Sequence, residues 1–347
     1  MKRILSFILT IIFTLSLTAC SREQIRDFVD NSAEKVGNII GYAEDAIRNP
    51  DSANKYNPVC EKADEIDAHK TTLTNGTKFD YLKLYEYVQY NTLSSDEKKC
   101  YHLLAQAAYK LESEVNVAYL KIKTDRIDEI FHKFVADNPQ LFYLAKSFSY
   151  GYDPETNVVS TITLCYTDGK TMDKYDSNQK LIKSADKNKI KSDIKTLDNA
   201  IKSILSRVNS NSDKEDIEKA IYDYICSNVE YDKALADNAA EELSPSYSFT
   251  IYGALCDKLA VCEGYTKAFQ YLCYLAGINS TQVSGIGNGG PHMWNMVEID
   301  NKWYHTDVTW GHTYIQGQVS YDFYNLTESE MLSHDHEISQ QNLTIPK

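Results

Sequence analysis

The chain has 347 residues with ordinary apolar and charged content, enough for a sizeable core and about two domains at roughly 150 residues each. Its 49 Asp and Glu residues outnumber 36 Lys and Arg residues, which gives a formal net charge of −13. This balance argues against a nucleic-acid binder, which needs a basic surface, and against electrostatic docking on anionic lipid, so any membrane attachment is expected to be covalent.

Residues 1–20 have the features of a signal peptide. A short positive start and an apolar run from Ile4 to Leu17 precede Cys20, and the run is shorter than the about 20 residues that span a bilayer. Small residues directly before Cys20 resemble the bacterial lipoprotein signal, which implies that this cysteine is lipidated. A plain secretory signal that contains a cysteine is the alternative. We therefore expect a lipoprotein anchored through Cys20 at the bacterial cell surface, facing outward from the membrane.

The sequence contains seven cysteines besides Cys20, an odd number, so at least one is unpaired or pairs between chains. No spacing resembles a disulfide framework. There is also no CxxC motif, which argues against a zinc-ribbon or thioredoxin-type site.

Residues 21–57 are predicted to be a tether. Apolar residues at helical spacing indicate an amphipathic helix that ends near Asn49 and Pro50, and a solvated spacer is the alternative.

Residues 58–208 are predicted to form a mixed α/β region. Its signals are a capping box at Ser94 and Glu97, helical faces over residues 101–111, 127–134 and 190–205, and two β-rich runs over residues 141–150 and 158–166. No recognisable chemistry falls in this region, so both a scaffold and a substrate-binding module remain open. A polar joint follows at residues 209–213, and a second capping box at Ser212 and Glu215 is expected to begin a domain over residues 213–347.

Cys262 falls in the first turn of a predicted helix. Apolar residues recur at helical spacing from Val261 to Ala276, and Gly277 offers a C-cap. Free backbone N–H groups and the positive end of the helix dipole stabilise a thiolate at such a position. Cys262 is therefore a candidate nucleophile, although a buried structural thiol is the alternative when the motif is taken alone.

A β-hairpin is predicted around Asp300 and Asn301. If these two residues form the turn, opposed residues have numbers that sum to 601, so Trp294 faces Asp307 and His292 faces Thr309. His292 and Asp307 then lie diagonally on one face, within hydrogen-bonding reach, whereas a turn of odd length would put them on opposite faces.

The helix and the hairpin together supply a thiol, an imidazole and a carboxylate. In this interpretation His292 takes the proton of the Cys262 thiol and later protonates the leaving amine, while Asp307 orients the ring. The first backbone amides of the helix would stabilise the oxyanion. His305, on the same predicted face, is a rival partner for Asp307. Glu263 is interpreted as a charge at the helix start.

Three motifs resemble the transglutaminase-like superfamily, specifically the bacterial surface-protein branch of that papain-like fold. They are residues 261–265 (Val-Cys-Glu-Gly-Tyr), 292–295 (His-Met-Trp-Asn) and 303–310 (Trp-Tyr-His-Thr-Asp-Val-Thr-Trp), and the resemblance covers about residues 213–330. It implies an α+β fold in which the cysteine helix packs against an antiparallel sheet. It also implies that Cys262 is the nucleophile, His292 the base and Asp307 the orienting acid.

Two positions depart from the family pattern. Relatives have an oxyanion donor upstream of the cysteine, and no residue here can be assigned to it. They often carry acidic residues where this chain has Gly311 and His312. No cofactor or metal is needed by the implied chemistry, and the run from His334 to His336 is interpreted as a solvated turn rather than a metal site.

We expect a surface-anchored thiol enzyme that forms a thioester from an amide. Water would resolve the thioester in a peptidase or amidase, and an amine would resolve it in a transglutaminase, which the sequence leaves open. Peptides, cell-wall stem peptides and neighbouring surface proteins are candidate substrates. A catalytically silent binding or assembly module is the alternative, and acyl transfer of the arylamine N-acetyltransferase kind is a more remote one.

Overall fold

The computed structural model describes residues 8–11, 70–72, 78–80, 88–176, 180–208, 212–238, 245–313, 318–339 and 343–346. The predicted lipidation site Cys20 and the predicted tether at residues 21–57 lie outside these ranges. Residues Ile8–Ile11, inside the predicted signal peptide, form strand β1. Within the described ranges, every helix is too short or too polar to cross a bilayer.

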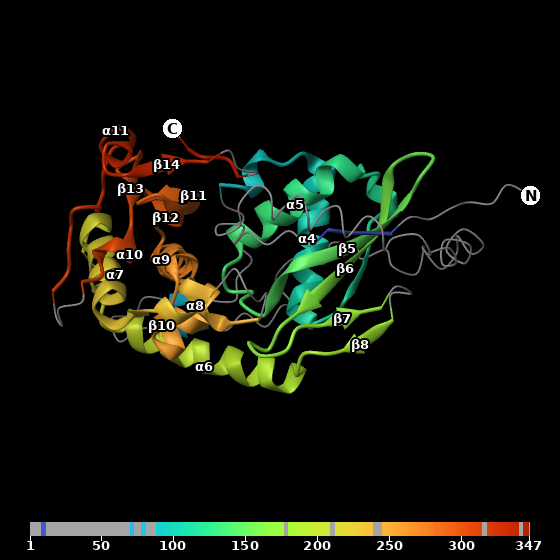
Figure 1. The fold of residues 1–347 in the computed structure, drawn as a ribbon, viewed down its shortest axis with the longest axis horizontal. Coiled ribbons are helices and arrows are strands. Elements are labelled where there is room, and N and C mark those ends of the chain that lie inside the picture. Colours follow the sequence, from blue (N-terminus) through green and yellow to red (C-terminus); the bar gives the residue numbers. More distant parts are fainter. Residues whose placement is uncertain are drawn as a thin grey trace, which may run out of the picture.

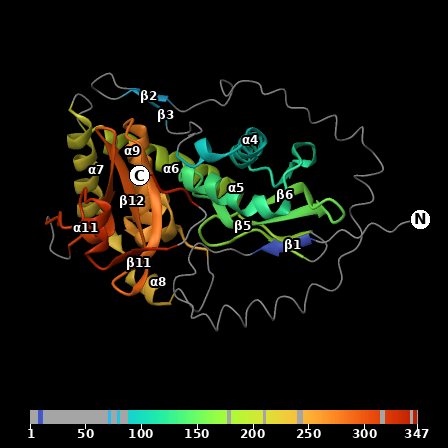
Figure 2. The same ribbon diagram turned by 90° about the horizontal axis from the view of Figure 1, so that it is seen from above.

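The first part of the chain forms a four-stranded sheet of order β1-β5-β6-β4 with helices packed on it. Figure 2 shows α4 and α5 over β5 and β6, and Phe131 of α5 stacks on Phe148 of β5. The elements are β1 (Ile8–Ile11), β2 (Lys70–Thr72), β3 (Lys78–Asp80), η2 (Tyr90–Thr92), α4 (Ser95–Lys110), β4 (Glu114–Asn116), η3 (Ala118–Leu120), α5 (Thr124–Asp137), β5 (Leu144–Asp153), β6 (Val158–Tyr166), β7 (Lys174–Tyr175), β8 (Leu181–Lys183) and α6 (Lys187–Leu205).

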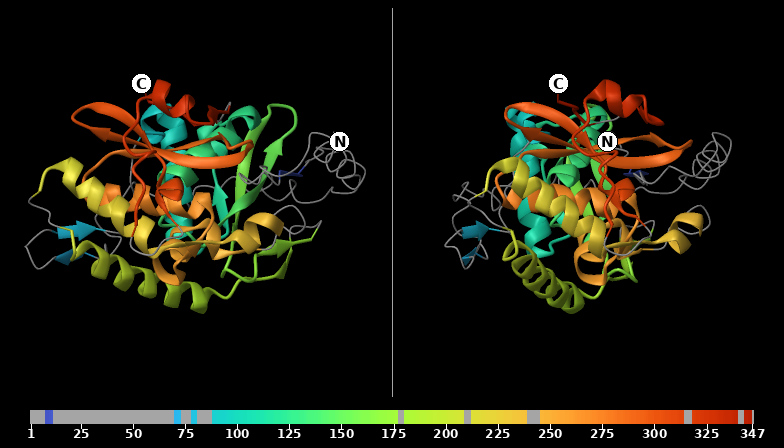
Figure 3. Two further views of the ribbon diagram at one scale, coloured as in Figure 1. Left: turned by 60° about the vertical axis from the view of Figure 1, so that its left-hand side comes forward. Right: turned by 90° about the vertical axis from the view of Figure 1, so that its left-hand side faces the viewer.

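The last part of the chain forms an antiparallel sheet of order β13-β12-β11-β14, and α9 packs on β11 and β12 (Figure 3). The elements are α7 (Lys214–Asn228), β9 (Glu230–Tyr231), α8 (Lys233–Asn238), η4 (Tyr247–Phe249), η5 (Gly253–Asp257), β10 (Leu259–Ala260), α9 (Cys262–Leu275), β11 (Ser280–Gly287), β12 (Gly290–Ile299), β13 (Lys302–Thr306), α10 (Val308–Gly311), α11 (Glu328–Leu332) and β14 (His336–Ile338). This is the predicted α+β arrangement, with the cysteine helix against an antiparallel sheet.

The helix boundaries confirm most of the predicted caps and correct one. Ser94 and Glu97 form the capping box of α4. Gly277 ends α9 with a φ of +76°. The predicted box at Ser212 and Glu215 is wrong, because Asp213 is the N-cap of α7 and accepts a hydrogen bond from the backbone N–H of Asp216 at 2.9 Å. Ser212 therefore lies one residue before the N-cap.

Asp300 and Asn301 form the predicted two-residue turn between β12 and β13. Their φ angles are +50° and +61°, the left-handed values that a type I′ turn requires at both positions. Ile299 pairs with Lys302 and Asn295 with Thr306, so the predicted register is confirmed.

One continuous hydrophobic core joins the two parts of the chain, and α6 runs along the lower edge of both in Figure 1. Polar contacts also cross between them, because the side-chain amides of Gln270 and Gln282 donate to the backbone carbonyl of Ala136 at 3.0 and 3.1 Å. The packing brings β5 close to the start of α9. A division into residues 58–208 and 213–347 stays a prediction.

Candidate active site

Cys262 is the first residue of α9 and is half-buried, as the predicted helix requires. Val261 is the N-cap, and its side chain has no hydrogen-bond acceptor. No N-cap side chain therefore occupies the first-turn backbone N–H groups, which can stabilise a negative charge at the helix start. Gly264 allows the helix to begin close to η4, because a Cβ there would lie 2.4 Å from the carbonyl oxygen of Ser248. The sulfur is thus held at a helix N-terminus without being sealed in the core.

The hairpin brings His292 and Asp307 together. The imidazole Nε2 of His292 lies 2.6 Å from Oδ2 of Asp307, and both side chains are buried. The predicted pairs of Trp294 with Asp307 and of His292 with Thr309 are not formed, since the ladder stops at Thr306 and α10 begins at Val308. The two side chains meet because Asp307 leaves the strand beside the ring.

Asp307 accepts four hydrogen bonds. The backbone N–H groups of Thr309 and Trp310 donate to Oδ1 at 2.8 and 3.2 Å, which makes Asp307 the N-cap of α10. His292 and His336 contact Oδ2 at 2.6 and 3.2 Å. Burial raises the pKa of this carboxyl, but the two imidazoles outweigh burial and hold the pKa well below its usual range. The carboxylate is therefore ionised and fixed in orientation.

His292 links this carboxylate to the sulfur of Cys262. Burial lowers the pKa of the His292 ring, whereas the Asp307 carboxylate and a hydrogen bond with Cys262 raise it, to about 10. The ring therefore contacts Asp307 through Nε2 and also hydrogen-bonds with Cys262. The ring keeps its proton at neutral pH, so the sulfur of Cys262 lies beside a cation that can later donate a proton.

Aromatic rings set the position of His292. Trp310 stacks on the imidazole with ring centroids 5.0 Å apart and planes 23° apart. Trp294 donates its indole N–H to Nδ1 of His305 at 2.9 Å. His305 therefore does not partner Asp307, and the rival assignment is wrong because its ring turns toward the indole. Burial and the neighbouring His336 lower the pKa of His305 to about 4.

A cluster of the half-buried Lys146 with the buried Glu263 and Lys267 lies at the start of α9, next to Cys262. Lys267 contacts one carboxylate oxygen of Glu263 at 2.6 Å and Lys146 contacts the other. Burial raises the pKa of Glu263, but the two lysines outweigh it and lower the pKa. Burial lowers the pKa of Lys146, while Glu263 and then Cys262 oppose that shift. Glu263 is thus held between two lysine side chains at the start of α9.

Sequence reasoning missed Lys146 and His336. Lys146 is separated from Glu263 by 117 residues and lies in an ordinary strand, so no local signal identifies it. The run from His334 to His336 was interpreted as a solvated turn, and for His336 this is wrong, because its side chain is buried on Asp307.

The ligand atoms of His292, Asp307 and His336 lie within 4.8 Å of one another, a spacing compatible with a metal site. However, an ion about 2.0 Å from each ligand atom would keep those atoms more than about 3 Å apart. The 2.6 Å separation between His292 and Asp307 is a direct hydrogen bond, so the cluster is built as a hydrogen-bond network.

We expect the His292–Asp307 pair to stabilise the fold in a pH-dependent way. The pKa of His292 is about 10 in the folded chain and about 6.5 for an ordinary histidine. Below about pH 6.5 both states hold the proton and the stabilisation is complete; between about pH 6.5 and about 10 the unfolded chain holds fewer protons, so the stabilisation declines.

Urea denaturation at several pH values checks this expectation. The difference in free energy of unfolding between wild type and His292→Gln should be largest near about pH 6 and shrink toward about pH 10. Asp307→Asn should lose the same pH dependence. A difference that is constant across this range would contradict the pairing.

Comparison with known proteins places this geometry in a family. Residues 202–308, which include Cys262, His292 and Asp307, match the family model of the transglutaminase-like superfamily. Kyphoscoliosis peptidase from Homo sapiens is 27% identical over 147 residues, which cover 37% of this chain and 22% of that protein. The Mus musculus protein of the same name is 26% identical over 156 residues, covering 40% of this chain and 23% of that protein.

The chain thus spans less than a quarter of the length of these curated relatives. A solved structure of a TGase has a TM-score of 0.31 and 19% sequence identity, covering 44% of this chain and 40% of that chain. The family assignment rests on the sequence match. Residues 202–308 are therefore identified by this match as transglutaminase-like.

Proposed function

We propose that this protein is a cysteine-dependent enzyme that acts on amide bonds of peptides or proteins. Cys262 is the nucleophile, His292 the proton carrier and Asp307 the residue that orients His292. The observation that carries the proposal is the placement of His292 between the half-buried sulfur of Cys262 and an ionised carboxylate. The match of residues 202–308 to the transglutaminase-like superfamily supports it.

The reaction begins when the Cys262 sulfur attacks the carbonyl carbon of the amide. The C–N bond then breaks, the leaving amine takes the proton from His292, and the acyl group remains on the sulfur as a thioester. His292 next removes a proton from water, which attacks the thioester and releases a carboxylic acid and the thiolate. The first-turn amides of α9 stabilise the oxyanion that forms on the carbonyl oxygen.

Hydrolysis is the outcome that we favour over transfer to an amine. The human and mouse relatives are both named as peptidases, which supports attack by water. The signal-like segment ending at Cys20 supports a lipid-anchored protein at the bacterial cell surface. Peptides, cell-wall stem peptides and neighbouring surface proteins are the substrates that such a location would offer.

We predict that iodoacetamide labels Cys262 faster than the other half-buried thiols. Cys165 and Cys256 are matched controls within the same chain, because burial raises the pKa of each to about 12. Peptide mapping by mass spectrometry after timed labelling gives the three rates. Cys262→Ala should remove the fast phase, and Asp307→Asn should slow it. Equal rates at all three sites would refute a nucleophilic Cys262 and favour a silent binding module.

A peptide library incubated with wild type and with Cys262→Ala identifies the reaction. Backbone cleavage that depends on Cys262 would support the hypothesis that the protein is a peptidase. Deamidation, in which water replaces ammonia and a side-chain amide becomes a carboxylic acid, would indicate an amidase. Loss of ammonia with a new isopeptide link would indicate a transglutaminase. Identical spectra from both proteins would contradict an enzymatic role toward these peptides.

The position of the His292 ring depends on the absence of a side chain at Gly287. A Cβ at Gly287 would lie 2.8 Å from Cδ2 of the His292 ring, whereas a Cβ at Gly290 would meet only a carbonyl oxygen at 3.9 Å. We therefore expect Gly287→Ala to displace the ring and slow Cys262 labelling, by up to about 100-fold if the shift approaches about 1 Å. The matched variant Gly290→Ala should label at the wild-type rate. Equal rates in both variants would show that ring position does not control the thiol.

A further inference from the structure

His336 reaches Asp307 from a strand at the edge of the sheet. Strand β14 pairs antiparallel with β11, and Gly287 lies opposite His336. Gly285 allows β14 to approach β11 closely, because a Cβ at this position would lie 2.0 Å from the carbonyl oxygen of Glu337. The side chain of His336 is almost fully buried, at 1% exposure. The sheet thus delivers a second imidazole to the carboxylate that already holds His292.

The hydrogen bonds of His336 identify its ring as a double donor. Nδ1 lies 2.9 Å from the backbone carbonyl oxygen of His334, and a carbonyl oxygen only accepts. Nε2 lies 3.2 Å from Oδ2 of Asp307, and an ionised carboxylate also only accepts. An imidazole donates from both nitrogens only when both carry a proton. The arrangement therefore places a second cation against Asp307.

Aromatic packing fits a fixed, charged ring at this position. Trp310 and Trp294 lie with ring centroids 4.4 and 4.8 Å from that of His336, and Phe323 lies at 5.4 Å. Indole rings attract cations at such separations. The neighbouring His305 is a weak base, with a pKa of about 4, which suits a site beside a positive charge.

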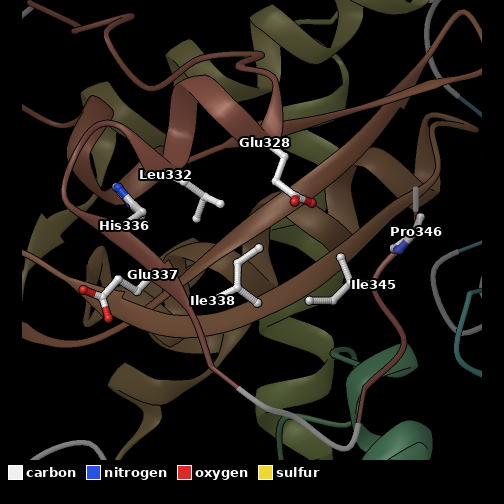
Figure 4. Close-up of a pocket in the computed structure, with 7 residues that line it drawn as sticks. All are labelled: Glu328, Leu332, His336, Glu337, Ile338, Ile345 and Pro346. Atoms are coloured by element: carbon white, nitrogen blue, oxygen red, sulfur yellow. The ribbon is translucent and has the colours of Figure 1, made fainter.

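The other charged groups around His336 leave Asp307 as its partner. The His292 ring centroid is 5.6 Å away. On its other side, His336 forms part of the wall of a cavity of about 540 Å³, which it shares with Glu328, Leu332, Glu337, Ile338, Ile345 and Pro346 (Figure 4). Glu328 and Glu337 are exposed acids, and neither is hydrogen-bonded to His336 in the structure.

We propose that His336 is a positioning residue that holds Oδ2 of Asp307 toward His292 by donating a second hydrogen bond to it. This inference rests on the proposed function. With four donors on two oxygens, Asp307 has no free direction in which to rotate. The charge of His336 also offsets part of the Asp307 charge, so His292 gives up its proton to the leaving amine more readily than it would beside Asp307 alone.

Two substitutions separate these effects from simple packing. His336→Gln keeps an N–H donor without the charge, and His336→Phe keeps the aromatic volume without any donor. His334→Ala is the matched control, because His334 is exposed and hydrogen-bonds to His336 only through its backbone carbonyl. Near-ultraviolet circular dichroism establishes that each variant has folded.

Nuclear magnetic resonance of the ring atoms gives the first readout. In wild type we expect both ring nitrogens of His336 to be protonated, and a low-field proton from the His292–Asp307 hydrogen bond. That low-field signal should persist in His336→Gln and in His334→Ala, and should shift or disappear in His336→Phe. A neutral His336 ring, or an unchanged low-field signal in folded His336→Phe, would overturn the proposal.

The rate of Cys262 labelling gives the second readout. We expect His336→Phe to lower it by about 10- to 100-fold, the scale seen when an outer hydrogen-bond partner of a functional histidine is removed. His336→Gln should recover most of that loss, and a Gln variant as slow as the Phe variant would contradict the donor role. If wild-type Cys262 labels no faster than Cys165, the proposed function fails instead, and the resonance measurement still decides whether His336 holds Asp307.

Discussion

A buried carboxylate that must be fully hydrogen-bonded is the constraint on which the site depends. Moving an ion out of water costs several kcal/mol, and good donors must offset this cost. The donors to Asp307 come from the start of α10, from β12 and from β14. Three elements are therefore fixed relative to one another by a single side chain. The hydrogen bond to Asp307 fixes the orientation of the His292 ring. The ring is therefore held beside the sulfur of Cys262.

A second group of buried charges ties the first part of the chain to the nucleophile. Lys146 belongs to β5, whereas Glu263 and Lys267 belong to α9, one turn apart. Removing Lys146 would leave Glu263 with one cation instead of two in a buried setting, a change that costs more than the loss of an exposed ion pair. Together with the continuous core, this contact makes β5 part of the surroundings of Cys262. The strand therefore contributes to the site and does more than connect other elements.

The sequence predicted what local patterns control. The helix start at Cys262 follows from apolar spacing, and the register of β12 and β13 follows from the turn at Asp300 and Asn301, which the observed pairing confirms. Contacts that depend on tertiary packing were out of reach: Lys146 lies in a distant strand, and His336 looked like part of a polar tail. Strand alternation made His305 a candidate partner for Asp307. The imidazole of His305 instead accepts a hydrogen bond from Trp294, and strand alternation does not predict the direction of a side-chain ring. The cap at Asp213 was missed because two adjacent residues could each cap the helix.

The stacking of Trp310 on His292 gives the site an intrinsic optical signal. An imidazolium in face-to-face contact with an indole quenches its fluorescence, whereas a neutral imidazole does so much less. Because the ring centroids of His292 and Trp310 are 5.0 Å apart, a proton on His292 adds to the constant quenching of Trp310 by His336, whose ring lies at 4.4 Å. Each proton transfer to a departing amine should therefore brighten the emission briefly. Turnover could be followed in stopped-flow experiments without a labelled substrate, and a substrate could be recognised by this flash before its products are known.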